Sequence, residues 1–391
     1  ESMVLGMTEK DVIKKINSIT NCIVLYANQV ANHASLITLL AALKQTHPNI
    51  PRAVLENTQA VTSYSLRAIK DQLIHAGADY LITGEAEHKI ENFIKSLSLN
   101  NSNGGIKRIP GILSATFDNN TYSQASDLDM LPFPDWEKFP LDNYWNLKFA
   151  HGPLSAKRYL PILTSRGCPY PCNFCVIPET NNRRWRSRTG ENVAAELAYM
   201  KSKFNVDEFH IEDVNPTVND TRTKELCHSI ISKELDVTWK ISAGTKIETI
   251  KDYKTVELMY HSGCRYISVS PESGSERVRR FIGKQFDVAH ALKIISYCKE
   301  FGIKTQACFV LGFPGEDDVD RQKSAGLLKG LVRCGLDEVA VFIITPVPGS
   351  TIYKNNSIKG YGSLSNLTFT PDWRDDYQIL SKFRMSLYLK Y

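Results

Sequence analysis

The chain has 391 residues, a length above the size at which a single hydrophobic core usually stops growing, so we expect two domains. Its 42% hydrophobic and 23% charged residues are ordinary for a globular protein. The net charge is +5, and the sequence lacks the clustered Lys and Arg residues that are typical of a nucleic-acid binder. No stretch reaches the roughly 18 uninterrupted apolar residues of a membrane span, and residues 1–10 lack a secretory signal. Composition therefore predicts a cytoplasmic protein with no membrane span and no nucleic-acid partner.

Residues 1–125 alternate strand-like apolar runs with helical patterns, which predicts a small Rossmann-like open α/β sheet. No G-x-G-x-x-G segment follows any of the strands, so the fingerprint of a dinucleotide site is absent. Ligands of such sheets bind at the carboxyl ends of the strands. The expected elements are strands at 22–28, 51–57 and 79–85, helices at 34–46 and 62–76, a loop at 98–105, a hairpin within 111–123 and a proline-rich linker over 126–158.

The pattern restarts at residue 159 and is stronger, with six strands of which the first five are each followed by a helix. This repetition predicts an α/β domain built as a partial (β/α)6 barrel of the TIM type over 159–353, with a C-terminal extension over 354–391. Reactive groups of such barrels lie at the carboxyl ends of the strands. The expected strands are residues 159–164, 208–214, 238–244, 266–272, 305–312 and 338–345.

Three of the nine cysteines stand together as C-x3-C-x2-C directly after the first barrel strand: Cys168, Cys172 and Cys175. Pro169 and Pro171 keep this segment from closing into a helix that would splay the thiols apart. The other six are isolated and are expected to be buried free thiols. They are Cys22, Cys227, Cys264, Cys298, Cys308 and Cys334.

Three thiolates on one short loop can bind a [4Fe–4S] cluster and leave one iron open. An open iron can chelate the amino and carboxylate groups of S-adenosylmethionine (SAM) and pass it an electron, which yields a 5′-deoxyadenosyl radical. The alternatives are a structural zinc site and chance clustering. Structural zinc normally has four ligands, and no fourth Cys or His lies nearby in the sequence.

The segment CPYPCNFC resembles the radical SAM signature C-x3-C-x-φ-C, with Phe174 as the aromatic residue. The segments FHIEDVNPTVN, SVSPESGSERV, FVLGFPGE and ITPVPGSTIY are similar, in order and at the strand ends, to those of the cobalamin-associated class of radical enzymes. In the first domain, ADYLITGEAEHKIENFI resembles the last strand, loop and helix of the cobalamin-binding domain of that class. LPFPDW resembles the interdomain linker of these enzymes, and LTFTPDWRDDYQIL their closing helix region.

The resemblance implies a SAM-binding set at the barrel strand ends. For Gly312, the alternative to a SAM contact is an ordinary turn. For the segment SPESGS, the alternative is a helix cap through Ser273 or Ser275. Glu212 and Asp213 point to opposite faces, so only one of them faces the barrel mouth. The implied residues are Phe174, Asp213, Ser270, Glu272, Ser273, Gly312 and Phe313.

Two further features stay open. The basic stretch at 183–188 fits either an anion contact or a solvated face. His33, His75, His88 and His210 have no ligand spacing, so surface or core roles are favoured for them.

The resemblance also implies a cobalamin site on the loops after the first-domain strands. The D-x-H-x-x-G signature is absent, and the sheet is one βα unit shorter than the usual domain of the family. The implied contact residues are Asn28, Gln29, Val30, Gly84, Glu85 and Glu87.

Taken together, the resemblance implies a cobalamin-dependent radical SAM enzyme that methylates an unactivated carbon or phosphorus centre. Its substrate would be a small molecule, lipid precursor or peptide, and its electron donor a flavodoxin or ferredoxin. The alternatives are a radical cyclisation or rearrangement without methyl transfer and a non-catalytic iron–sulfur protein. A methylthiotransferase acting on transfer RNA is disfavoured, because only Cys22 precedes Cys168 and the extra N-terminal cysteine triad of that group is missing.

Overall fold

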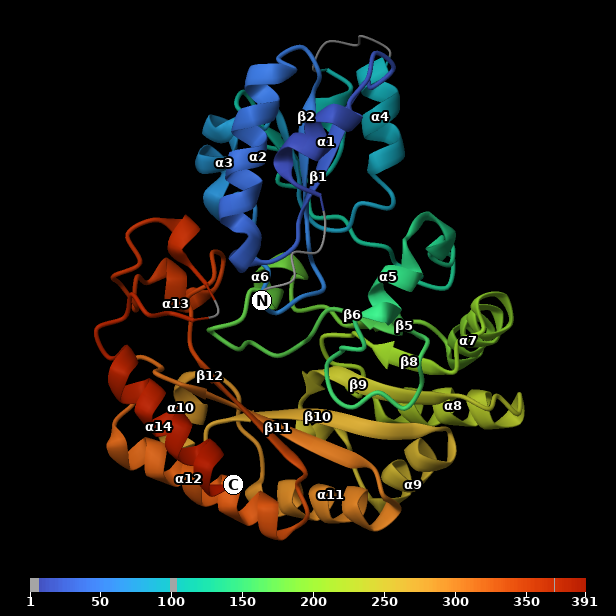
Figure 1. Cartoon of the computed structure of the whole chain (residues 1–391), viewed down its shortest axis with the longest axis vertical. Helices are drawn as coiled ribbons and strands as arrows, with labels where there is room; N and C mark the ends of the chain where they lie inside the picture. Colours follow the sequence, from blue (N-terminus) through green and yellow to red (C-terminus); the bar gives the residue numbers. More distant parts are fainter. Residues whose placement is uncertain (1–6, 99–103, 369) are drawn as a thin grey trace. The chain divides into compact units, whose positions relative to one another are not determined.

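The computed structural model describes residues 7–98, 104–368 and 370–391 (Figure 1), so most of the loop expected at 98–105 lies outside the described residues. The chain divides into two compact units. The first, here called the N-terminal unit, combines Glu1–Ala125, Phe174–Asn182 and Thr345–Thr368. The second, here called the barrel unit, combines Ser126–Asn173, Arg183–Ile344 and Phe369–Tyr391. The division expected from the sequence, into residues 1–125, 126–158, 159–353 and 354–391, stays a prediction.

The N-terminal unit contains a four-stranded sheet in the order β1-β2-β3-β4. Its first three strands are parallel, and β4 pairs antiparallel with β3. Leucines at i, i+4 and i+7 of α2 are buried, as the apolar spacing predicts. The strands are β1 (Ile23–Ala27), β2 (Arg52–Glu56), β3 (Tyr80–Ile82) and β4 (Ile112–Ser114), and the helices are α1 (Glu9–Lys15), α2 (His33–Thr46), α3 (Lys70–Ala76), α4 (Ile90–Ser98), α6 (Ile177–Thr180) and α13 (Thr351–Lys354).

Two local expectations in this unit are corrected. The helix expected at 62–76 is regular only in α3, because the N–H of Leu66 donates to the Glu56 carboxylate at 2.9 Å instead of entering a helical ladder. The hairpin expected within 111–123 contains one named strand, β4, whose return is a single bridge between Leu113 and Asp118.

The barrel unit is built on a parallel six-stranded sheet in the order β12-β11-β10-β9-β8-β5. Sequence neighbours are spatial neighbours, and helices α8, α9, α11 and α12 run along one face (Figure 1). The predicted partial (β/α)6 architecture is confirmed. The strands are β5 (Tyr159–Ile162), β8 (Glu208–Ile211), β9 (Thr238–Thr245), β10 (Cys264–Glu272), β11 (Lys304–Leu311) and β12 (Glu338–Ile343). The helices are α5 (Leu141–Asn146), α7 (Gly190–Phe204), α8 (Asp220–Ser232), α9 (Tyr253–His261), α10 (Glu276–Phe281), α11 (Val288–Phe301), α12 (Asp318–Arg333) and α14 (Tyr377–Lys390).

A polar network on the strands binds the segment that precedes β5. Glu208 accepts hydrogen bonds from the backbone N–H of Ser155 at 2.5 Å and of Ala156 at 2.8 Å. The same carboxylate accepts from His210 at 2.8 Å and pairs with Lys240 at 3.1 Å. The end of the expected linker is therefore a fixed part of the barrel unit.

The C-terminal helix α14 packs on the barrel sheet. Leu380 and Leu387 are buried in the main core, and the backbone N–H of Val341 in β12 donates to the Tyr388 hydroxyl at 2.9 Å. Among the described residues, no helix has the length and apolar character needed to cross a membrane.

Candidate functional site

The segment 167–175, here called the cysteine loop, leaves the sheet just after β5. Two short strands, β6 (Ser165–Arg166) and β7 (Arg186–Ser187), pair antiparallel. Their pairing brings together the two ends of the segment that contains the cysteine loop. The Trp185 indole N–H lies within hydrogen-bonding distance of two acceptors, the Ser165 hydroxyl at 3.2 Å and the Asn215 carbonyl at 3.0 Å. These contacts fix the base from which the cysteines project.

Asp213 lies just beyond the end of β8 and is completely buried beneath that base. Its carboxylate accepts from the backbone N–H and the hydroxyl of Thr164, each at 2.6 Å, and from the Ser165 hydroxyl at 2.5 Å. Arg222 of α8 donates to the Thr164 carbonyl at 2.8 Å. Burial raises the Asp213 pKa, and the Arg222 guanidinium opposes that rise. Asp213 thus holds the loop base, while its expected contact with SAM stays a prediction that this burial does not favour.

The basic stretch at 183–188 divides into two parts. Arg186 is buried, and Arg188 ion-pairs with the buried Glu196 and donates to the Leu163 carbonyl at 3.0 Å. Arg184 is exposed. The solvated-face interpretation therefore fails for Arg186 and Arg188, and the contacts of Arg188 are internal to the barrel unit.

The three cysteines are partly accessible. Cys168, Cys172 and Cys175 are half-buried, and none of them forms a disulfide. Burial raises the pKa of Cys172, and Lys284 is the strongest opposing influence. Cys175 precedes α6, and its sulfur accepts from the backbone N–H of Ile177 at 3.5 Å.

Within the part of the chain that the structure describes, no three Cys, His, Asp or Glu side chains surround a single metal ion. Each thiolate of a [4Fe–4S] cluster binds a different iron, so cluster ligands need not converge on one ion. Three cysteines at the motif spacing, a loop base fixed by hydrogen bonds and nearby cationic side chains suit an iron–sulfur cluster. The residues present therefore fit that group.

Glu272 ends β10, where the register with β11 shifts between Val269 and Glu272. Its backbone φ of 60° is rare for a residue with a side chain, and its carboxylate forms a buried 2.6 Å ion pair with Lys284. A strained position at a strand end is common at functional sites. Ser270 lies close to Gly244, since a Cβ added there would be 2.4 Å from the Ser270 hydroxyl oxygen.

The serines after Glu272 are structural. The hydroxyl oxygens of Ser273 and Ser324 are 3.1 Å apart, and both side chains are buried against α12. Ser275 caps α10 by accepting from the N–H of Val278. The capping alternative is confirmed for Ser275, and a SAM contact through Ser273 stays a prediction.

The peptide of Gly312, directly after β11, is held from both sides. Its N–H donates to the Glu316 carboxylate at 2.5 Å, and its carbonyl accepts from Arg374 at 2.9 Å. Its φ is 82°, and an added Cβ would lie 2.6 Å from Leu380. Phe313 is buried. Glycine is therefore required at position 312 because a side chain would collide with Leu380 and Arg374. The sequence motif did not predict this contact.

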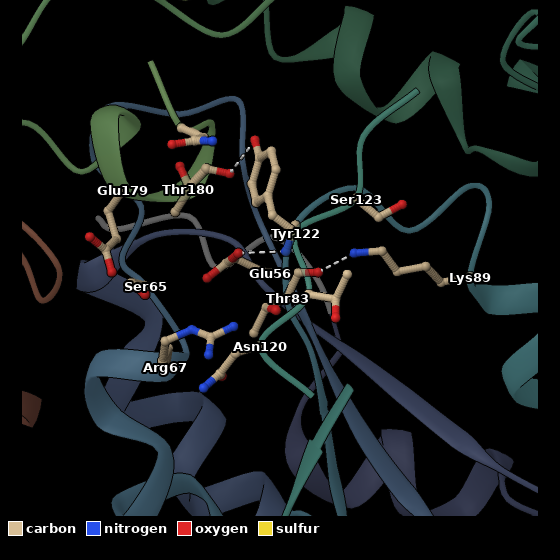
Figure 2. Close-up of a pocket in the computed structure, with 13 residues that line it drawn as sticks. Glu56, Ser65, Arg67, Thr83, Lys89, Asn120, Tyr122, Ser123, Glu179 and Thr180 are labelled. Atoms are coloured by element: carbon tan, nitrogen blue, oxygen red, sulfur yellow. Dashed lines mark hydrogen bonds between the residues drawn. The ribbon is translucent and has the colours of Figure 1, made fainter. Parts of the chain in front are cut away.

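The N-terminal unit has a cavity of about 200 Å³ at the carboxyl ends of β2 and β3 (Figure 2). The buried Glu56 accepts from the N–H of Gly84 at 2.6 Å, and the Lys89 ammonium donates to the Thr83 carbonyl at 2.5 Å. Burial raises the Glu56 pKa and lowers that of Lys89. The cavity is lined by Glu56, Ser65, Arg67, Thr83, Gly84, Lys89, Asn120, Thr121, Tyr122, Ser123, Glu179, Thr180 and Asn182.

Of the six residues implied for cobalamin, Gly84 alone lines this cavity. Glu85 is buried and accepts from the Ala125 N–H at 2.8 Å, while Glu87 is exposed. The other three follow β1: Asn28 accepts from Asn57, Gln29 is half-buried, and the N–H of Val30 donates to the Thr62 carbonyl at 3.0 Å. The cavity residues Glu56 and Lys89 were missed, although Glu56 ends a predicted strand, where ligands of such sheets bind.

Comparison with known proteins agrees with the cysteine motif. Residues 162–328 match the Radical SAM superfamily. An uncharacterized methyltransferase of Pyrococcus horikoshii is 26% identical over 303 residues, which are 76% of this chain and 60% of the relative. The cytidylyl-2-hydroxyethylphosphonate methyltransferase of Streptomyces wedmorensis is 27% identical over 247 residues, 61% of this chain and 45% of the relative. The chain thus spans 60% or less of the length of these two relatives.

The solved structure of the radical SAM methyltransferase TsrM from Kitasatospora setae, with tryptophan and a SAM analogue bound, superposes with a TM-score of 0.67. The match covers 90% of this chain and 68% of that one at 14% identity, a level that shows a shared fold. It confirms the predicted combination of an open α/β sheet with a partial barrel. The cysteine motif and this fold thus agree with the match of residues 162–328 to the Radical SAM superfamily.

Proposed function

We propose that this enzyme cleaves SAM reductively and uses the 5′-deoxyadenosyl radical in a cobalamin-dependent methylation of an unactivated carbon or phosphorus centre. The observation that carries the proposal is the cysteine loop, with three cysteines at C-x3-C-x2-C next to a base closed by the pairing of β6 and β7. The two curated relatives above are named methyltransferases, and one name specifies a phosphonate. When bound, the cluster supplies the electron that cleaves SAM, and cobalamin supplies the methyl group.

The chain's own residues would bind and orient the cluster and SAM. Asp213 and Arg222 bind Thr164 at the base of the loop, four residues before Cys168. Glu272 presents a buried carboxylate at the end of β10, where a SAM amino group could replace Lys284 as its partner. Glu316 and Arg374 hold the Gly312 peptide in the conformation that would admit the adenine. Holding reactants in one geometry is the main protein contribution to such reactions.

A cobalamin would be bound at the carboxyl edge of the N-terminal sheet. The cavity there is lined by hydroxyl, amide and charged side chains, which suit the amide-rich periphery of a corrinoid. Its volume of about 200 Å³ is below the roughly 300–1,000 Å³ of pockets for drug-sized ligands. It would therefore take one polar arm of the cofactor, with the remainder outside the cavity.

The substrate class and the redox partner complete the proposal. We assign a small molecule, lipid precursor or peptide as substrate and a flavodoxin or ferredoxin as electron donor. A reducing, cytoplasmic setting is supported by the nine cysteines, none of which forms a disulfide.

The test uses the full chain purified without oxygen in the presence of hydroxocobalamin. The expected result is an iron–sulfur absorption band that dithionite bleaches, retained corrinoid bands and release of 5′-deoxyadenosine from SAM. Cys172→Ala should lose the iron–sulfur band, whereas Cys334→Ala, a matched half-buried thiol at the end of α12, should keep it.

Three other results of this experiment would each contradict a different part of the proposal. Iron–sulfur absorption and 5′-deoxyadenosine without corrinoid would overturn cobalamin-dependent methylation in favour of a radical cyclisation or rearrangement. A fully loaded cluster that never yields 5′-deoxyadenosine would overturn the enzymatic proposal. The absence of both chromophores after reconstitution would overturn the cluster itself.

A further inference from the structure

Two buried lysines flank the cysteine loop and have no role assigned by the motif. Lys284 lies in the turn after α10, and Lys246 lies directly after β9. Both are buried in the barrel unit. Buried lysines are uncommon unless a negative partner compensates them.

Lys284 is placed by direct packing of its turn on the cysteine loop. The backbone N–H of Asn173 donates to the Ile282 carbonyl at 3.1 Å, and the Asn173 side chain donates to the Phe281 carbonyl at 2.8 Å. Gly283 has a φ of 71°, and an added Cβ would lie 3.1 Å from the Pro171 carbonyl oxygen. The turn therefore lies against Pro171 to Asn173, and Lys284 follows immediately.

Lys246 approaches the same loop from another strand. Its ammonium lies 4.6 Å from the ring centroid of Tyr170, the residue midway between Cys168 and Cys172. It also donates to the Gln285 carbonyl at 2.8 Å, beside Lys284. The two cations thus converge on the segment that contains the first two thiols.

Each of the two lysines has a carboxylate partner, Glu272 for Lys284 and Glu248 for Lys246. Glu272 is one carboxylate partner for Lys284, at 2.6 Å, and an ammonium has three N–H donors. Although burial opposes it, the Glu272 carboxylate together with the Cys172 and Cys168 thiols raises the pKa of Lys284. The two lysines therefore place positive charge beside the segment that carries Cys168 and Cys172.

We propose that Lys284 and Lys246 supply positive charge that makes an iron–sulfur cluster on the cysteine loop easier to reduce. This inference rests on the proposed function, since it requires the cluster. A [4Fe–4S] core with three thiolates is anionic, and the single electron from dithionite or a flavodoxin adds one more negative charge. Nearby cations in a low-dielectric site stabilise that reduced form, and charge is among the determinants of cluster potential.

The test is a potentiometric titration of the reconstituted full chain without SAM, followed by the electron paramagnetic resonance signal of the reduced cluster. Lys284→Met removes the charge and keeps a chain of similar length. The midpoint potential should shift to more negative values, with iron content and signal shape unchanged. Lys246→Met should shift it in the same direction.

The matched control is Lys240→Met. Lys240 is also a buried, ion-paired lysine of β9, but it precedes Lys246 by six residues, about 20 Å along a strand. Its replacement should leave the midpoint potential at the wild-type value. A wild-type chain without a cluster would reject the proposed function and not this assignment.

Unchanged potentials in both lysine variants with full clusters would overturn the proposal. A shift that occurs only after SAM is added would also overturn it, because Lys284 would then act as a ligand of the SAM carboxylate. If Lys284→Met fails to load iron, the Lys246→Met potential decides: a negative shift supports the proposal, and no shift rejects it.

Discussion

Asp213 and Thr164 are joined by two hydrogen bonds of 2.6 Å, in which the Thr164 backbone N–H and hydroxyl both donate to the same buried carboxylate. Thr164 is the residue between β5 and β6, so this pair ties the end of β8 to the base of the cysteine loop. Arg222 closes the arrangement by donating to the Thr164 carbonyl. The base of the cysteine loop is thus held by a buried carboxylate, Asp213, and a buried guanidinium, Arg222. Both residues lie outside the cysteine loop in the sequence.

Replacement of Asp213 by Asn should therefore destabilise the protein and impair cluster loading. The change weakens the hydrogen bonds that Thr164 and Ser165 donate to the Asp213 carboxylate and removes the negative charge near the buried Arg222. Losing hydrogen bonds to a charged group costs roughly 1.5–3 kcal/mol. Iron per chain after reconstitution and the melting temperature measure the effect. Glu91→Gln, which breaks an exposed ion pair with Lys95 on α4, should leave the melting temperature close to the wild-type value and keep the iron. Wild-type iron and stability in Asp213→Asn would reject the anchoring role.

Replacement of Arg374 by Gln should weaken SAM binding without loss of iron. Arg374 donates to the Gly312 carbonyl at 2.9 Å and to the Ile344 carbonyl at 3.0 Å, so it holds the ends of β11 and β12. Losing hydrogen bonds from a charged group costs roughly 1.5–3 kcal/mol, which corresponds to about a tenfold to hundredfold rise in Kd. Titration of SAM into the anaerobic, cluster-loaded chain measures this change. The exposed Arg333→Gln is the control, and equal SAM affinity in both variants would contradict the prediction.

Strand alternation and the cysteine motif were enough to predict the barrel. In β8, Phe209 and Ile211 are buried in the main core, while Glu208 and His210 alternate with them on the polar network. This period of two is visible in the sequence and locates each strand to within a few residues. The motif then follows β5, as barrel chemistry requires.

Long-range pairing could not be predicted in the same way. Nothing in the sequence indicates that Arg374 binds Gly312, since 62 residues separate them. The same holds for Ser155, which donates to Glu208 across 53 residues. Alternation showed that Glu212 and Asp213 face opposite ways, but it could not tell which one serves the loop base. These pairings depend on how elements pack, and a single sequence carries no record of that.

Replacement of Lys89 by Met should reduce corrinoid retention and spare the iron–sulfur cluster. Lys89 donates to the Thr83 carbonyl at 2.5 Å and lines the cavity of the N-terminal unit with Glu56 (Figure 2). Its loss removes the cation that most strongly lowers the pKa of the buried Glu56, and it disturbs the loop that carries Gly84. The ratio of corrinoid to iron after gel filtration gives the readout. Lys70→Met, which breaks a partly exposed pair with Asp118, should leave that ratio unchanged, and a wild-type ratio in Lys89→Met would count against a corrinoid at this cavity.

Acid stability should depend on Glu208. Burial alone would raise the pKa of this carboxyl, but hydrogen bonds from His210 and Ser155 and the charge of Lys240 lower it to about 2. The unfolded value is about 4.3, so the folded pKa is depressed and the stabilisation is fully present above that value. It is lost as pH falls from about 4 through 2, and its size is on the order of 3 kcal/mol.

His210 affects a separate pH range. Burial lowers its pKa, so the stability that depends on neutral His210 is lost as pH falls below its unfolded value of about 6.5. Urea unfolding of the cluster-free chain from pH 7 to 3 should show both losses in the wild type. Glu208→Gln should be less stable at pH 7 and should lack the loss below pH 4, while the exposed Glu225→Gln on α8 should follow the wild-type curve. A wild-type slope below pH 4 in Glu208→Gln would place the titrating group elsewhere.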